Sequence, residues 1–103
     1  MILHLATFRW REDVTADAVS ALTDALKAMA AGIPELRSYV CGEGLGLRPG
    51  GADYGVAAIV DDAAALDAYL NSPLHKDVYD KHLGVMIAER AAIQLPLESG
   101  SLT

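Results

Sequence analysis

Apolar residues alternate with polar or small ones in the opening stretch MILHLATFRW, residues 1–10. In a strand, which has a period of two, His4, Ala6 and Phe8 share one side, and the residues between them share the other. We therefore predict a first strand over residues 2–9, in which the His4 side chain has apolar neighbours.

After the first strand, the spacing of the apolar residues changes from that of a strand to that of a helix. Thr15 is a suitable N-cap because its hydroxyl can accept from an unpaired N–H of the first turn, and Asp17 lies where the helix dipole favours an acid. Gly32 and Pro34 end the helix, since neither residue continues one readily. The apolar positions at helical spacing are Val19, Leu22, Leu26, Met29 and Ile33.

Two further strands follow, LRSYVCG at residues 36–42 and YGVAAIVD at residues 54–61. Both contain the β-branched and aromatic residues that favour strands. The connection between them, EGLGLRPGGAD, is rich in glycine, but a phosphate-binding loop would need a helix after its glycines. Because a strand follows instead, we interpret this segment as a flexible hairpin.

The second half of the chain predicts two helices that meet at a proline. Asp61 or Asp62 is the N-cap of the first helix, and Pro73 ends it because the proline ring removes a donor and disfavours helical geometry in the preceding residue. Ser72 and Pro73 are also a favourable start for a second helix. We predict that this second helix ends at Gly84.

A last strand is predicted in AERAAIQLPL, residues 88–97, followed by a polar tail at residues 98–103 that we expect to be flexible. The resulting order indicates one domain over residues 1–97, a ferredoxin-like βαββαβ sandwich of the α+β class. Helices cover only one face of such a sheet, and the other would expose apolar side chains. We therefore predict a homodimer that buries the uncovered face.

Composition and charge narrow the classes of partner. The chain has 103 residues and a formal net charge of −6, so we expect no nucleic-acid partner, because such binding needs clustered cations. The single cysteine, Cys41, excludes an internal disulfide and a thiolate zinc site. No leader peptide or membrane-spanning apolar run is recognisable, and we therefore expect a cytoplasmic protein that is neither exported nor embedded in a membrane.

Four segments carry a resemblance to a known family: ILHLATFRW, GIPELRSY, DYGVAAIVDDAAALDAY and, above all, YLNSPLHKDV. In these segments the chain resembles the stress-responsive A/B barrel, or Dabb, domains from residue 2 to about residue 95. The most specific part is the tyrosine, proline and histidine of Tyr69, Pro73 and His75, to which His4 adds.

The resemblance implies a ferredoxin-like protomer that pairs through its sheet into a dimeric α+β barrel. It implies no single activity: some plant members are stress-induced proteins without a clear reaction, whereas olivetolic acid cyclase closes a polyketide without a cofactor. Likeness to that cyclase implies that Tyr69 and His75 are catalytic and that His4 lines the substrate pocket.

The residues themselves allow two interpretations. His75 would be the third residue of a helix, where the dipole disfavours an imidazolium, so that a neutral ring could act as a general base while Tyr69 donates a hydrogen bond to a developing alkoxide. Alternatively, His75 helps to cap the helix, Tyr69 lies at the edge of the core, and His4 is a satisfied core residue. His75 and His82 are seven residues apart, too far to share an ion, so we predict no metal site.

We therefore expect a protein that binds a small apolar or polyketide-like molecule in a barrel cavity, with cofactor-free acid–base chemistry such as cyclisation. The alternative is a non-catalytic stress-responsive or assembly protein. A cofactor-free monooxygenase, as found on related dimeric folds, is a third option that nothing in the sequence favours. Glu89 and Arg90, near the last strand, could pair across a dimer interface.

Overall fold

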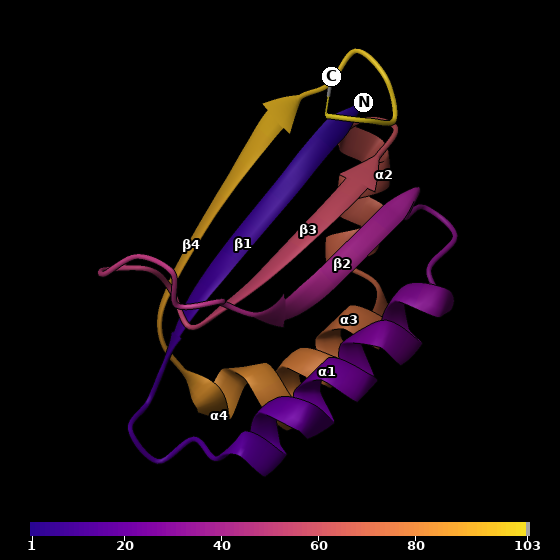
Figure 1. The fold of residues 1–103 in the computed structure, drawn as a ribbon. Coiled ribbons are helices and arrows are strands. Elements are labelled where there is room, and N and C mark those ends of the chain that lie inside the picture. Colours follow the sequence, from indigo (N-terminus) through magenta and orange to yellow (C-terminus); the bar gives the residue numbers. More distant parts are fainter. Residues whose placement is uncertain (103) are drawn as a thin grey trace.

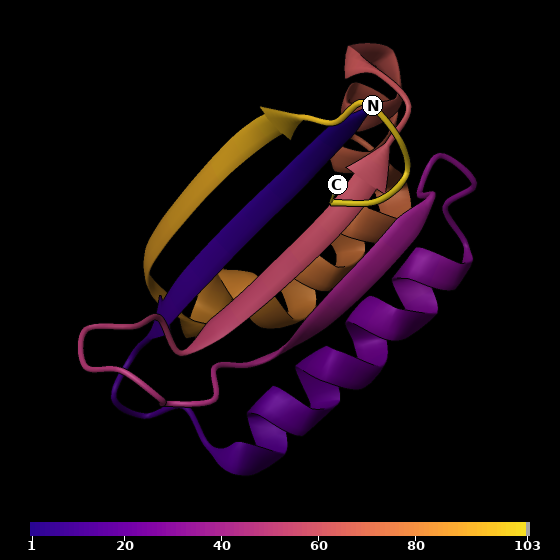
Figure 2. The same cartoon turned by 45° about the horizontal axis from the view of Figure 1, so that its top comes forward.

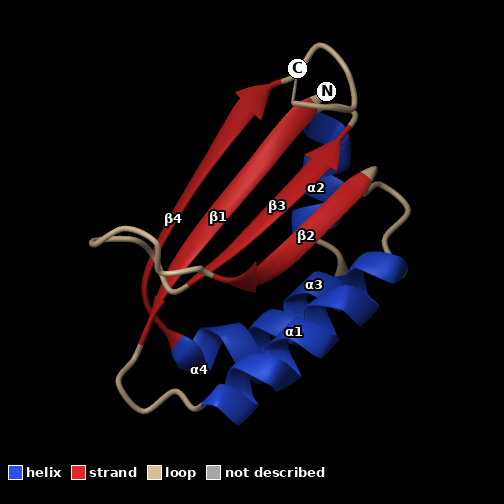
Figure 3. Cartoon of the chain, in the orientation of Figure 1, coloured by secondary structure: helices blue, strands red, loops and turns tan. Residues whose placement is uncertain are grey.

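The structure, a computed structural model, describes residues 1–102. Within them, one antiparallel sheet has the strand order β2-β3-β1-β4, and the helices lie against one of its faces (Figure 1, Figure 3). This arrangement confirms the predicted ferredoxin-like α+β fold. The elements are β1 (Ile2–Trp10), α1 (Ala16–Ala31), β2 (Ser38–Glu43), β3 (Tyr54–Val60), α2 (Ala63–Leu70), α3 (Pro73–Val78), the π-helical turn η1 (Tyr79–Leu83), α4 (Gly84–Met86) and β4 (Ile87–Pro96).

Side-chain caps set the helix starts as the sequence predicts. The Thr15 hydroxyl accepts a hydrogen bond from a backbone N–H in the first turn of α1 at 3.1 Å. Of the two candidate caps of α2, Asp62 accepts from the Ala65 N–H at 2.8 Å. Asp61 instead forms an ion pair with Arg37, with an Oδ1–Nε distance of 2.6 Å. The chain then turns at Pro73, the first residue of α3.

The prediction that Gly84 ends the last helix is wrong. The chain widens into the turn η1 and continues helically through Gly84, whose φ is −60°, as far as Met86. A Cβ at Gly84 would lie 3.1 Å from the Tyr79 carbonyl oxygen and 3.2 Å from Tyr79 Cε1. The glycine therefore provides room for the neighbouring tyrosine ring and carbonyl. All four strands also differ by one or two residues from their predicted bounds: β1 extends to Trp10, β2 starts at Ser38, β3 ends at Val60, and β4 starts at Ile87.

The core lies between the sheet and the helices. Its apolar members come from alternate positions of β1 and β3 and from the inner stripe of α1. The hydroxyl of Tyr54 on β3 lies 2.7 Å from the hydroxyl of Thr23 on α1. The two polar groups therefore form a hydrogen bond with each other between the sheet and the helices. Apart from the tyrosines, His4 is the one buried polar side chain among the described residues, with 5% of its surface exposed.

The other face of the sheet carries an apolar row across all four strands. Val40, Ala57, Leu5 and Ile93 are successive register partners on β2, β3, β1 and β4. Val40 and Ile93 at the two ends are 65% and 52% exposed. The loop between β2 and β3 projects beyond the end of the sheet (Figure 2). The predicted uncovered apolar face is thus present in the protomer.

Two sequence-based expectations concern the chain outside this layer. Among the described helices, none combines the length and the apolar character that a bilayer crossing requires. In the segment after β4, the hydroxyls of Ser99 and Ser101 lie 3.2 Å apart. The flexibility of residues 98–103 stays a prediction, and Thr103 lies outside the described residues.

Candidate functional site

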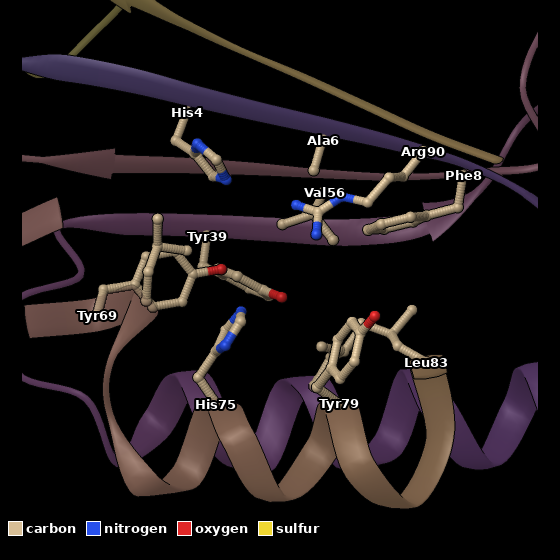
Figure 4. A pocket seen from close by; sticks show the side chains of 12 residues that line it. His4, Ala6, Phe8, Tyr39, Val56, Tyr69, His75, Tyr79, Leu83 and Arg90 are labelled. Carbon is tan, nitrogen blue, oxygen red and sulfur yellow. The ribbon is translucent and has the colours of Figure 1, made fainter. Parts of the chain in front are cut away.

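A cavity of about 50 Å³ lies between the sheet and the α2–α3–η1 segment (Figure 4). His4 and Tyr69 at one end of it are buried, whereas Tyr79 and Arg90 at the other end are exposed. We call the exposed end the mouth of the cavity. The lining residues are His4, Ala6, Phe8, Leu26, Tyr39, Val56, Tyr69, Leu70, His75, Tyr79, Leu83 and Arg90.

Alternation along the strands decides which sheet residues enter the cavity. Even-numbered residues of β1 face the helices, and so do their register partners. Opposite His4 on β4 is Gln94, whose Nε2 lies 2.9 Å from His4 Nδ1. Opposite Phe8 is Arg90, and β2 contributes Tyr39.

The proline junction between α2 and α3 brings the predicted catalytic pair together. Tyr69 lies in the last turn of α2, and the Ser72 hydroxyl caps α3 so that His75 follows one turn later on the same side. The rings of Tyr69 and His75 meet edge to face, with centroids 5.2 Å apart. Tyr69 also lies edge-on to His4 at 6.2 Å and to Tyr39 at 6.4 Å. Thus Tyr69 is the centre of a contiguous cluster that contains all three predicted site residues.

Both imidazoles of this cluster favour the neutral form. Burial, and after it the charge of Arg90, lowers the pKa of His4. Burial is also the largest cause that lowers the pKa of His75, followed by the charges of His4 and Arg90. Desolvation is therefore the main cause of a neutral His75, and not the helix N-terminus from which the sequence predicts it. A neutral imidazole near pH 7 can accept a proton.

The two phenols of the cluster keep their protons. Burial raises the pKa of Tyr69 to about 12, although the hydroxyl of Tyr39 opposes the shift. Burial likewise raises the pKa of Tyr39, with the nearby Tyr69 as the next cause. The two hydroxyls are close enough to influence each other's pKa, but within the described residues the Tyr39 hydroxyl is buried without a completed hydrogen bond. Both groups therefore act as hydrogen-bond donors at neutral pH, not as bases.

Arg90 is a site residue that the sequence reasoning missed. Within the protomer, Glu89 lies 3.8 Å from Arg9, and the Arg90 side chain extends toward the cavity beside Phe8 (Figure 4). The pairing of Glu89 and Arg90 across a dimer interface stays a prediction. The signal for this placement is the pairing of Arg90 with Phe8, which becomes visible only when the strand register is known.

Other candidates lie outside the cavity. His82, two turns after His75, does not line it. Within residues 1–102, no three potential ligands from histidine, cysteine, aspartate or glutamate gather in a metal-binding arrangement. The titratable groups that line the cavity in this structure are two imidazoles, two buried phenols, the exposed phenol of Tyr79 and one guanidinium.

Comparison with solved structures gives the same architecture. A dimeric ferredoxin-like protein of unknown function from Thermobifida fusca is 38% identical, with a TM-score of 0.87 over 93% of this chain and 90% of that one. The hydroxynitrile lyase from Passiflora edulis has a TM-score of 0.79 over 97% of this chain and 96% of that one. Its identity is 12%, so this second likeness concerns the fold alone.

Sequence comparison identifies the family. An uncharacterised protein of Streptomyces coelicolor is 36% identical over 78 residues, which are 74% of this chain and 80% of that protein. The profile of the family described as "Stress responsive A/B Barrel Domain" matches residues 2–96, which include every element of the fold. The chain therefore belongs to the stress-responsive A/B barrel (Dabb) domain family.

Proposed function

We propose that this protein binds a small carbonyl compound in the cavity and catalyses cofactor-free acid–base chemistry on it. The observation that carries the proposal is the edge-to-face contact between Tyr69 and His75, with ring centroids 5.2 Å apart. A group that accepts protons and a group that donates a hydrogen bond thus face one enclosed space.

In the proposed reaction, His75 removes a proton from the carbon beside the carbonyl group. The C–H electron pair forms the C=C bond of an enolate, the carbonyl π pair moves onto oxygen, and His75 becomes an imidazolium. Tyr69 donates a hydrogen bond to this oxygen, and such preorganised donors stabilise developing negative charge. The enolate carbon then recovers a proton, or it attacks a second carbonyl carbon, and the imidazolium protonates the resulting alkoxide.

The cavity volume bears on the size of the substrate. About 50 Å³ is room for only a few water-sized spheres, since one such sphere needs about 10–15 Å³. A short-chain carbonyl compound that extends into the mouth fits better than a long polyketide, which would require Tyr79 and Arg90 to move. The Passiflora neighbour, a hydroxynitrile lyase, supports the view that this fold accommodates enzymes as well as proteins of unknown function.

Deuterium exchange tests the proposed proton transfer. The probe is 2-pentanone in D₂O, with loss of its α-proton signals followed by NMR. We expect the wild type to accelerate the α-proton exchange of 2-pentanone over its rate in buffer. In His75→Ala this acceleration should be about 100-fold smaller or absent, because the base is removed. Tyr69→Phe should weaken it less. His82→Ala is the matched control, since His82 lies outside the cavity. Exchange at the buffer rate by the wild type would favour the alternative, a non-catalytic stress-responsive or assembly protein.

We also propose that the protein is a homodimer formed through the outer sheet face, and that it resides in the reducing cytoplasm, which the free thiol of Cys41 fits. The row from Val40 to Ile93 supports the dimer, because exposed contiguous apolar patches mark association sites. Ile93→Glu should give a folded monomer in analytical ultracentrifugation. Leu45→Glu, at an 84% exposed leucine of the loop between β2 and β3, should remain dimeric. A monomeric wild type would contradict the proposal.

A further inference from the structure

Arg90 brings a positive charge to the cavity that no side chain within residues 1–102 balances. Four ion pairs occur within residues 1–102, and their cations are Arg9, Arg37, Lys76 and Lys81. Over the same range the Arg90 guanidinium makes neither an ion pair nor a hydrogen bond, although it faces the cavity (Figure 4).

The rest of the cavity lacks an anion as well. None of its lining residues is an aspartate or a glutamate. The buried Tyr39 hydroxyl is a second donor there without a completed hydrogen bond. A buried donor that stays unpaired costs about 1–3 kcal/mol, so a cavity with surplus donors and no carboxylate favours a ligand that supplies the acceptor.

We propose that the ligand of this cavity carries a carboxylate, which the Arg90 guanidinium binds at the mouth while the uncharged part of the ligand extends toward Tyr69 and His75. This inference deepens the proposed function and rests on it for the position of the reacting carbon. It names the substrate class as short-chain keto acids.

A carboxylate suits this mouth better than a phosphate does. The planar guanidinium fork matches the two oxygens of a carboxylate, and one cation balances its single negative charge. A phosphate ester would bring more charge into a chain whose net charge is −6, and Arg90 is the single lysine or arginine among the lining residues. Because Arg90 is exposed, the carboxylate would keep part of its hydration, which limits the desolvation cost.

A pair of matched probes tests the inference. 4-Oxopentanoate has a carboxylate where 2-pentanone has a methyl group, and both carry the same methyl ketone. NMR titration at low ionic strength should show that the wild type binds 4-oxopentanoate about tenfold more tightly than 2-pentanone, a modest ratio because the ion pair is partly exposed. The ratio should fall at high salt.

Variants locate the source of the preference. Arg90→Gln should bind the two probes equally, and Arg90→Lys should keep part of the preference because it retains the charge without the fork. Tyr39→Phe should weaken the binding of 4-oxopentanoate severalfold. Arg48→Gln, in the loop between β2 and β3, makes the same change of net charge outside the cavity and should keep the full preference.

The outcomes separate this inference from the proposed reaction. Equal binding of the two probes by the wild type, a preference that survives in Arg90→Gln, or no binding of either probe would overturn the carboxylate inference. Exchange of 2-pentanone that depends on His75 would still support the reaction. Conversely, a preference that depends on Arg90 without any α-proton exchange would support carboxylate binding and overturn the reaction.

Discussion

Gln94 lies directly opposite His4 on the neighbouring strand, and its amide Nε2 is 2.9 Å from His4 Nδ1. In this orientation the amide donates, Nδ1 accepts, and the imidazole proton lies on Nε2. The amide therefore selects one tautomer of a buried ring that also contacts Tyr69. Gln94 is a positioning residue, since it acts on the cavity through His4.

Gln94→Glu should raise the pKa of His4, because a carboxylate would accept from Nδ1–H and stabilise the imidazolium. The matched control is Gln94→Leu, which removes the hydrogen bond without adding charge; it should leave the pKa lowered while both tautomers become populated. ¹⁵N NMR titration of the histidine side chains measures both effects. An unchanged tautomer in Gln94→Leu would show that the amide does not position the ring.

Stability should fall in acid because both cavity histidines are held neutral. Their pKa values are lowered below the ordinary 6.5, so between the folded pKa and 6.5 the unfolded chain binds more protons. The contribution to the free energy of unfolding is fully present above 6.5 and is lost as the pH falls through the folded pKa. Urea denaturation at pH about 7.5 and about 5 measures the loss.

The variant His75→Gln should reduce this dependence on pH, since one of the two groups no longer titrates. His82→Gln is the control, because His82 lies outside the cavity, and it should keep the wild-type dependence. If His75→Gln lost as much stability in acid as the wild type, burial of His75 would not be its source.

Two tyrosines should respond oppositely to loss of their hydroxyl groups. The Thr23 hydroxyl donates to the Val19 carbonyl, so the Tyr54 hydroxyl donates to Thr23 at 2.7 Å. Tyr54→Phe should therefore lower the free energy of unfolding by about 1 kcal/mol. Tyr39→Phe removes a buried hydroxyl that completes no hydrogen bond and should leave the stability unchanged or raise it by up to about 1 kcal/mol. Chemical denaturation of the two variants side by side would contradict this account if Tyr39→Phe were the more damaging.

Gly84→Ala should disturb the mouth of the cavity. The added Cβ would lie 3.2 Å from Tyr79 Cε1 and 3.1 Å from the Tyr79 carbonyl oxygen, so the ring or the π-helical turn must shift. We expect a loss of about 1 kcal/mol in the free energy of unfolding and an altered affinity for 4-oxopentanoate. Gly51→Ala is the control, because its nearest neighbour would be 3.7 Å away and it lies in the loop between β2 and β3. Equal effects of the two substitutions would argue against a packing role for Gly84.

The part of the site that follows from local patterns was predictable. Alternation along β1 predicts the side on which His4 lies, and the Ser72–Pro73 junction predicts that Tyr69 and His75 lie one turn apart across a bend. Both inferences need only neighbouring residues, as does the capping of α1 by Thr15. The strand and helix order followed for the same reason.

The remaining site residues depend on contacts between segments that are distant in the sequence. Gln94 and Arg90 enter the site through the register of β4 against β1, which no local pattern determines. The continuation through Gly84 was also beyond local rules, since the glycine's role is to make room for Tyr79. A glycine near a predicted helix end can either terminate the helix or allow another group to pack closely against the backbone. Which of the two applies depends on the tertiary packing.

β1 supplies His4, Ala6 and Phe8 to the cavity and, from the positions between them, Leu5 to the outer apolar row. A single inserted or deleted codon inside this strand would exchange the two surfaces in one step, sending the imidazole outward and a leucine inward. Length variation among relatives of this chain should therefore be confined to the segments outside Ile2–Trp10, whereas point substitutions on the two sides of the strand can accumulate separately.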